Sequence, residues 1–254
     1  MLRRTRQALE TLGHYFEFLG EIICSIPKKP SRLNQCLNEI ENLGVNSVLI
    51  IFLSGAAIGM IFSLQLVTFL RPFSAEIGVG AAVAIALARE LGPVITTLML
   101  IAKNGSAMAA ELGTMKVTEQ LDALESMSVS IVHYLVLPKV IASLLVFPIL
   151  TLLADIVGVI GAYLIAVPFF NIDSAGYVSY MFNLLNPRDI FFGLIKSAVM
   201  GVMTATICCF HGLRTTQGAR GVGDSATRAV VISSVSILVA DYLLTTLMLP
   251  IIYS

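Results

Sequence analysis

Residues 42–70 read NLGVNSVLIIFLSGAAIGMIFSLQLVTFL, a run of 29 residues without a charged side chain. A helix needs about 20 predominantly apolar residues to cross the hydrocarbon core of a bilayer, so this run is long enough to span a membrane. The whole chain has the same character, since 57% of its 254 residues are hydrophobic and 13% are charged. Soluble domains average about 25% charged residues. The sequence therefore predicts an integral membrane protein.

Four further apolar runs follow the first. The run that begins near residue 140 continues to Ile172 with Asp155 as its one charge. It is too short for two spans of about 20 residues and a turn, so we count it once. We predict an all-α integral membrane protein of about five transmembrane helices, at about 45–70, 77–102, 140–167, 189–210 and 229–252.

The first 43 residues have a different pattern. Their apolar residues recur at helical spacing opposite a polar face, which is typical of helices lying on a membrane surface. Packing on another protein would give the same pattern. We divide the chain into interfacial amphipathic helices over 1–43 and a transmembrane domain over 44–254. The apolar residues are Leu9, Leu12, Phe16, Leu19 and Ile23 in one stretch, and Leu33, Leu37 and Ile40 in a second stretch that Gly44 ends.

Basic residues gather in alternating loops. Of the 16 Lys and Arg residues, twelve lie in the N-terminal segment and in the loops after the second and fourth runs, whereas the opposite loops hold Arg71 and Arg188. Loops rich in Lys and Arg face the cytoplasm. The N-terminus is therefore predicted to be cytoplasmic and the C-terminus periplasmic. The 16 basic and 16 acidic residues balance, so no nucleic-acid partner is indicated.

Known catalytic motifs are missing from the sequence. It has no Gly-Lys pair of a phosphate-binding P-loop, no H-E-x-x-H helix and no G-x-S-x-G elbow. Its four cysteines lack metal-ligand spacing. We expect no catalytic residue, no metal and no cofactor in this chain.

Several charges fall inside the apolar runs, where each costs about 2.5–3.5 kcal/mol on insertion scales. Arg89 and Glu90 lie just before Leu91-Gly92-Pro93. They could form the polar end of an amphiphile site, with Arg89 facing a phosphate, or an ion pair between helices. For Asp155, Lys196 and Asp241 the alternatives are a proton relay or interhelical pairing, for example of Lys196 with one of the acids.

Small residues one turn apart predict close contact between helices. Gly55 and Gly59 offer it on the first run, and Ala154 and Gly158 offer it on the third.

The loop after the second run contains ELGTMKVTEQLDALESM, residues 111–127. Thr118 can cap a helix there, Glu119 complements the helix dipole, and Leu121, Leu124 and Met127 recur every three residues. We predict a short cytoplasmic helix over about 111–127 that docks on a partner. The alternative is a helix lying back on its own membrane domain.

Residues 88–127 also resemble the MlaE/YrbE-type permeases of lipid-transporting ABC systems that work with MCE-domain proteins. The family pattern runs RELGP, a glycine-rich turn, AAELGTM and TEQIDAL, and this chain reads ARELGPVITTLMLIAKNGSAMAAELGTMKVTEQLDALESM. Residues 218–231 with Asp241-Tyr242 resemble the final loop and helix, and the spacing of Gly44, Ser47, Gly59 and Gln65 resembles the first span. Lys103-Asn104 departs from the usual arginine and small or apolar residue, so a planar guanidinium is lost there.

The resemblance implies a half-transporter of the bacterial inner membrane. Two copies would form a homodimer, a cytoplasmic ABC ATPase would drive it, and an MCE-domain protein would exchange phospholipid or another hydrophobic lipid on the outer side. A small cytoplasmic STAS-like regulatory subunit is a further implied partner. The implied lipid-binding residues are Arg89, Glu90, Gln65 and Leu66. The implied ATPase-coupling residues are Glu111, Thr118, Glu119, Leu121, Asp122, Leu124 and Glu125.

Two other classes of function remain open from the residues alone. A proton-coupled secondary transporter would depend on Asp155 and Asp241 and would need no ATPase. A membrane-embedded lipid enzyme would require a nucleophile and a base within reach of each other.

Overall fold

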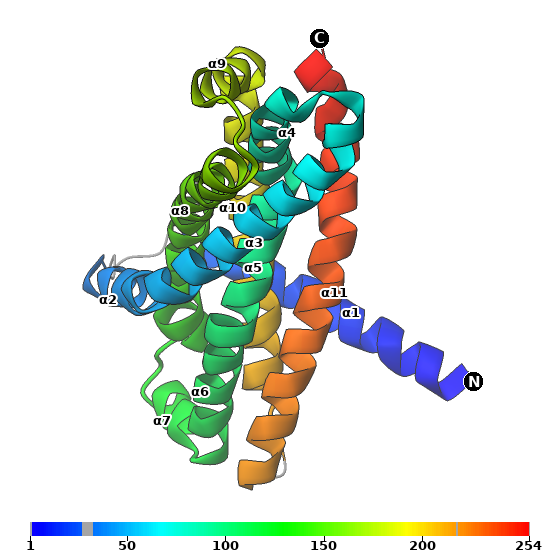
Figure 1. The fold of residues 1–254 in the computed structure, drawn as a ribbon. Coiled ribbons are helices and arrows are strands. Elements are labelled where there is room, and N and C mark those ends of the chain that lie inside the picture. The colour runs from blue at the N-terminus through cyan, green and yellow to red at the C-terminus, as the bar shows by residue number, and fades with distance from the viewer. Residues whose placement is uncertain (1, 27–32, 217, 254) are drawn as a thin grey trace.

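The computed structural model describes residues 2–26, 33–216 and 218–253, and these residues form helices joined by short turns, with no strand among them. Most of the long helices run side by side in one elongated bundle (Figure 1). The α-helices are α1 (Leu2–Ser25), α2 (Leu33–Gly44), α3 (Val48–Leu70), α4 (Val79–Ala86), α5 (Gly92–Leu100), α6 (Ser106–Val117), α7 (Gln120–Ser126), α8 (Leu137–Phe170), α9 (Ser174–Leu184), α10 (Pro187–Leu213) and α11 (Gly218–Tyr253).

Five helical segments of the described chain are long and apolar enough to cross a membrane. They confirm the predicted all-α membrane fold, and the 34-residue α8 confirms that the third run is one span. The segments are Asn34–Phe73, Glu76–Val117, Val132–Phe170, Pro187–Leu213 and Gly218–Met248.

Some of these segments are longer than a bilayer is thick. The second contains 42 residues, which at about 1.5 Å per residue is roughly twice the hydrocarbon thickness of about 30 Å. It includes two π-helical turns, Leu87–Leu91 and Ile101–Gly105, which join α4, α5 and α6 into one path. Its far part, α6, therefore extends to the end of the bundle where α7 and the start of α11 also lie (Figure 1).

The two N-terminal helices run across the bundle rather than along it (Figure 1). The hydroxyl groups of Tyr15 in α1 and Thr206 in α10 share a hydrogen bond of 2.9 Å, and Phe18 and Ile22 are buried. Leu12 and Phe16 on the same helix are exposed. Both amphipathic segments are thus helices, and their position on a membrane surface stays a prediction.

Small residues bring α3 and α8 into close contact. Gly55 packs on the backbone of Ala154 and Gly59 on that of Gly158, and a Cβ atom at Gly59 would overlap the carbonyl oxygen of Gly158. The structure thus brings together the small residues that the sequence offered separately on the first and third runs. Because this contact is between backbones, it fixes α3 against α8 at membrane depth.

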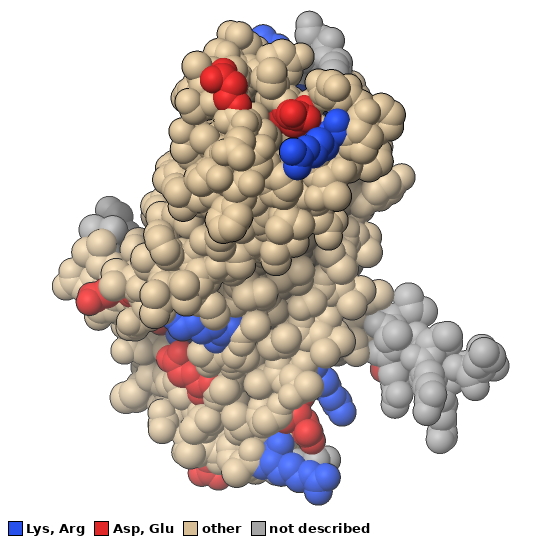
Figure 2. Space-filling view, viewed as in Figure 1, with Lys and Arg blue, Asp and Glu red and all other residues tan. Residues whose placement is uncertain are grey.

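Charged side chains on the face shown in Figure 2 lie near the upper end and over the lower half, and a broad band without charge separates the two groups. Such a band is what a protein with a lipid-facing belt presents.

Candidate functional site

Arg89 at membrane depth is paired with Asp189. Its Nε and Nη2 atoms each lie 2.9 Å from Asp189 Oδ1. Asp189 is 1% exposed and belongs to the capping box that begins α10, in which the Asn186 backbone N–H donates to Asp189 Oδ2. The carboxylate is therefore held by its own helix start, and Arg89 reaches across to it from the π-helical turn.

Lys196 of α10 is the centre of a second polar group, the Lys196 cluster, which consists of Glu90, Lys196, Asp241 and Thr245. Lys196 is 2% exposed. Its Nζ donates to Glu90 Oε2 at 2.6 Å, to Thr245 Oγ1 at 2.8 Å and to the Arg89 carbonyl oxygen at 2.9 Å. An ammonium has three donors, and Asp241 Oδ1 lies 2.8 Å away as an ion pair. The cluster therefore ties the π-helical turn, α10 and α11 together.

The proline of the RELGP motif explains one of these contacts. Pro93 has no N–H, so the carbonyl of Arg89, four residues earlier, loses its usual helical donor. Lys196 Nζ fills that position at 2.9 Å. Gly193, one turn before Lys196, allows α10 to approach, because a Cβ atom there would overlap the Ala88 carbonyl oxygen. The distorted turn is thus completed by a neighbouring helix.

The charge of the Lys196 cluster is unbalanced, with two carboxylates around one ammonium. Glu90 is the member that reaches the surface, with 42% of its side chain exposed, whereas 17% of the Asp241 side chain is exposed. The arrangement confirms interhelical pairing for Arg89, Glu90, Lys196 and Asp241. It also leaves Glu90 partly accessible for contact with a polar group from outside the chain.

The predicted lipid-binding residues do not all meet within one chain. Arg89 and Glu90 are adjacent on the π-helical turn, whereas Gln65 is exposed on α3 and Leu66 packs in an apolar cluster with Val67.

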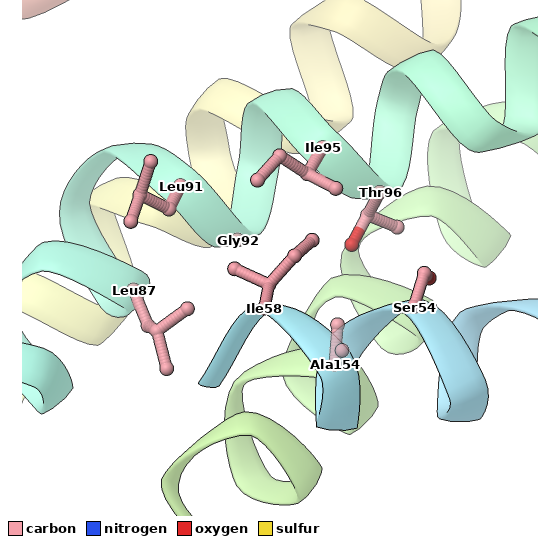
Figure 3. A pocket seen from close by; sticks show the side chains of 9 residues that line it. Ser54, Ile58, Leu87, Leu91, Gly92, Ile95, Thr96 and Ala154 are labelled. Atoms are coloured by element: carbon pink, nitrogen blue, oxygen red, sulfur yellow. The ribbon is translucent and has the colours of Figure 1, made fainter. Parts of the chain in front are cut away.

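Between the first and second spans the chain is nearly closed. Figure 3 shows the crevice there, with Ser54 and Ile58 of α3 facing Leu87, Gly92 and Thr96. Its volume is about 10 Å³, which is about the space for one water molecule. A lipid cavity between these two spans is therefore not open inside a single chain, and it would require a second copy or a movement of helices.

Asp155 of α8 differs from the other acids at this depth. Its Oδ1 atom is enclosed without a hydrogen-bond partner among the described residues and lies where a Cβ atom of Gly92 would be. Asp155 also lines an apolar cavity of about 250 Å³ with Met181 and Phe182 of α9. A proton relay that uses both Asp155 and Asp241 would need a hydrogen-bonded path between them. The described side chains do not form such a path.

The prediction of one helix over 111–127 is wrong. The structure continues the second span through α6 to Val117 and starts α7 at Gln120. Glu119 has a positive φ of 59°, which breaks the helix. Thr118 does not cap α7, because its hydroxyl donates back to the Thr114 carbonyl oxygen at 2.9 Å.

The side chains of this segment also face different surroundings from those expected. Leu121 is 1% exposed, so α7 lies partly on its own membrane domain, and Leu124 is half-buried. Asp122 and Glu125 are exposed, and Asp122 Oδ1 accepts a hydrogen bond of 2.8 Å from Lys116. The outward surface of α7 is therefore acidic rather than leucine-rich.

Glu111 is exposed, but its carboxylate is paired with α8. Its Oε2 atom lies 2.7 Å from Nζ of Lys139 in α8, and Lys139 also lies 2.7 Å from Glu39 Oε1 in α2. The sequence placed Lys139 in a basic loop, yet its side chain is 3% exposed. Sequence reasoning missed Glu39, Asp189 and Thr245 as partners. Signals existed for two of them, since Asp189 follows Asn186-Pro187 at a capping-box spacing and Thr245 is one turn after Asp241.

Comparisons with known proteins identify the family of the chain. The family model described as Permease MlaE matches residues 36–247. A protein of Rickettsia bellii named as a probable ABC transporter permease is 38% identical over 245 residues, which are 96% of this chain and 95% of the relative. The Haemophilus influenzae protein named "Intermembrane phospholipid transport system permease protein MlaE" is 38% identical over 213 residues, 84% of this chain and 82% of the relative.

A further relative in Synechocystis, also named as a probable ABC transporter permease, is 37% identical over 233 residues, 92% of this chain and 89% of the relative. The five apolar helices and these relatives define a multi-pass membrane permease of the ABC transporter class. The chain belongs to the MlaE permease family.

Proposed function

We propose that this chain is the membrane subunit of a lipid ABC transporter in the bacterial inner membrane. It moves phospholipid or a related hydrophobic lipid between that membrane and an MCE-domain protein on the outer side. Family membership carries the proposal, because the Haemophilus relative is named as the permease of an intermembrane phospholipid transport system. In this proposal the chain is a transport subunit, and a separate cytoplasmic ATPase hydrolyses ATP, with a STAS-like subunit as a further cytoplasmic partner.

The lipid contact is assigned to the turn that carries Arg89 and Glu90. Asp189 and Lys196 hold these two side chains at membrane depth, while 29% of Arg89 and 42% of Glu90 stay exposed. A guanidinium suits the phosphate of a lipid headgroup, and Gln65 and Leu66 of α3 would contact the rest of the lipid.

A second copy of the chain would complete the lipid cavity. α11 is the least buried of the five spans. It presents a stripe of exposed apolar residues at Val231, Val235, Leu238 and Tyr242. This stripe runs beside Thr245, which donates to Glu90 at 3.2 Å. A copy packed along α11 would therefore bring a partner surface next to Glu90, which supports a homodimer with the cavity between its subunits.

The ATPase is assigned to the end of the bundle that carries α7. The basic N-terminal segment and the basic loops predict that this end is cytoplasmic. The exposed side chains of Glu119, Asp122, Glu125 and Met127 form the surface that α6 and α7 offer there.

The proposal is tested by purifying the tagged chain from its native membranes in mild detergent and identifying stoichiometric proteins and bound lipids by mass spectrometry. An ATPase and an MCE-domain protein that co-purify with phospholipid are the expected result. A chain reproducibly free of partners, under conditions that keep other ABC complexes whole, would contradict it.

The unpartnered Oδ1 of Asp155 keeps a proton-coupled secondary transporter as a second candidate. In proteoliposomes with the co-purified partners, the Asp155→Asn chain should still move lipid when ATP is supplied. The rate of this lipid movement should not change when a proton gradient is applied. Lipid movement that requires the gradient and stops in Asp155→Asn would favour the secondary transporter instead.

A further inference from the structure

Lys139 joins three helices, α2, α6 and α8. It lies at the start of α8 with 3% of its side chain exposed, and its Nζ lies 2.7 Å from both Glu39 Oε1 in α2 and Glu111 Oε2 in α6. The Glu39 and Glu111 side chains are 21% and 52% exposed, so Lys139 is the buried member of the group. Moving both carboxylates away would leave its ammonium buried without a partner, and the group therefore resists separation of the helices. We name Glu39, Lys139 and Glu111 the Lys139 clamp.

A second polar contact holds the same corner, where α2 turns into α3. Asn104 Nδ2, in the π-helical turn before α6, donates to the Leu43 carbonyl oxygen and to Ser47 Oγ, each at 3.1 Å. Lys103 Nζ donates to the Asn46 carbonyl oxygen and to Ser47 Oγ. The residues Lys103 and Asn104, which depart from the family pattern, thus bind the chain between α2 and α3.

The spacing of these contacts makes the attachment rigid. Asn104 and Glu111 are seven residues apart, which is about two helical turns, so they share one side of the α6 path. Glu39 and Leu43 are one turn apart on α2. The α2–α3 corner is therefore attached to the α6 path at two points about 10 Å apart along the helix, directly at Asn104 and through Lys139 of α8 at Glu111. Sliding or tilting of the corner against α6 would strain these contacts.

The attached elements lead from the proposed ATPase surface toward the proposed lipid path. α6 continues through Thr118 and Glu119 into α7, and α3 begins at Val48, directly after the attached corner. A displacement of α6 and α7 would therefore be passed to α2 and to the start of α3.

We propose that Lys139 is a positioning residue that transmits movement of the ATPase from α6 to the α2–α3 corner, with Glu39 and Glu111 as its two arms. The inference rests on the proposed ATPase-driven function. It differs from a purely structural role because it predicts uncoupling, in which ATP is still hydrolysed while less lipid moves.

The test uses the chain with its co-purified ATPase and other partners in proteoliposomes containing a fluorescent phospholipid. The measured quantity is lipid moved per ATP hydrolysed. Glu39→Ala is the decisive variant, because it removes the acceptor as well as the charge of the α2 arm and leaves Lys139 paired with Glu111. Glu41→Ala, at an exposed carboxylate on the same helix, is the matched control. Lys139→Arg keeps the charge, and Lys139→Met removes it.

Glu39→Ala and Lys139→Met should lower lipid moved per ATP by about fivefold or more, the range of typical coupling between sites. ATPase association should be unchanged, and Lys139→Arg and Glu41→Ala should stay near wild type. A wild-type ratio in Glu39→Ala would overturn the proposal, even if Lys139→Met fails to fold. Absence of ATP-driven lipid movement in the wild-type complex would instead count against the proposed function itself.

A distance measurement separates transmission from stability. Spin labels at Asn38 of α2 and Ser126 of α7, both exposed, are introduced after replacing Cys24 and Cys36. In the clamped chain the distance between the labels should stay constant between nucleotide-free and ATP-bound states, because α2 follows α6. In Glu39→Ala the distance should change with nucleotide. A distance that responds equally in both chains would refute transmission through the clamp.

Discussion

Nζ of Lys196 in α10 lies 2.6 Å from Oε2 of Glu90, in the π-helical turn that precedes Pro93. The same ammonium satisfies the Arg89 carbonyl oxygen and pairs with Asp241. One buried cation therefore completes a distorted helix, neutralises part of an acidic pair and joins three spans. This concentration of roles makes Lys196 the residue whose loss should be most damaging.

Lys196→Met should lower the free energy of unfolding by about 3–5 kcal/mol, because it leaves two carboxylates facing each other without a cation. Thermal unfolding of the purified protein in detergent measures the change. Lys116→Met is the control, since Lys116 pairs with the exposed Asp122 and should cost about 0–1 kcal/mol. Adding Glu90→Gln and Asp241→Asn to Lys196→Met should recover much of the loss, and no recovery would show that charge is not the cause.

Gly92→Ala should destabilise the protein by about 1–3 kcal/mol, because the new methyl group overlaps Asp155 Oδ1 and the helices must shift. Gly223→Ala is the matched control. A Cβ atom there meets nothing within 4 Å, so helix propensity alone should make that change neutral or stabilising by up to about 1 kcal/mol. Thermal unfolding of both variants measures the difference in stability. Adding Asp155→Ala should relieve Gly92→Ala, and equal behaviour of the two glycine variants would contradict the contact.

Glu125→Lys should weaken ATPase binding about tenfold or more, because it reverses an exposed charge on the proposed docking surface of α7. Co-purification of the ATPase at increasing salt measures the effect, and membrane insertion should be unchanged. Glu41→Lys, also exposed but on α2, should bind normally. Leu121→Asp is not a clean test, because Leu121 is 1% exposed and the change should unfold α7. If Glu125→Lys binds the ATPase as tightly as the wild type, α7 is not part of the interface.

Tyr177 of α9, which lies outside the five spans, should make stability sensitive to alkaline pH. Burial raises the pKa of its phenol from 10.0 to about 12, with the Tyr163 phenol as a smaller cause. The folded state therefore holds the proton more tightly than the unfolded state. Its contribution is fully present below pH 10 and is lost as the pH rises through about 12.

The melting temperature of the wild type should consequently fall more steeply than that of Tyr177→Phe across this pH window. At neutral pH the variant should be as stable as the wild type or about 1 kcal/mol more stable, because the buried hydroxyl lacks a hydrogen-bond partner among the described residues. Parallel slopes for the two proteins would show that Tyr177 does not titrate on unfolding.

Much of the architecture could be predicted from the sequence. The uncharged run at 42–70 and its four successors correspond to the five spans, and the amphipathic spacing after Leu9 corresponds to α1. The block at 88–127 was sufficient to indicate the family. Each of these properties belongs to a single segment, because crossing a bilayer depends on the length and polarity of that segment alone.

Pairings between segments could not be predicted in the same way. Lys196 had Asp155 and Asp241 as candidate partners in the sequence, and the structure pairs it with Asp241 and with Glu90, while Asp155 lies against Gly92. The choice of partner depends on the rotation and relative height of whole helices. The composition of one segment does not determine either of them.

The segment at 111–127 shows the same division. Its helical content and charge were evident from the residues, but the break at Glu119 and the burial of Leu121 arise where α6 ends and α7 folds back. Membrane insertion, helix number and family were thus determined by the sequence itself, since they follow from local transfer energies and local motifs. Only the tertiary structure decided which charges meet and which surface of α7 faces outward, because both result from packing between distant helices.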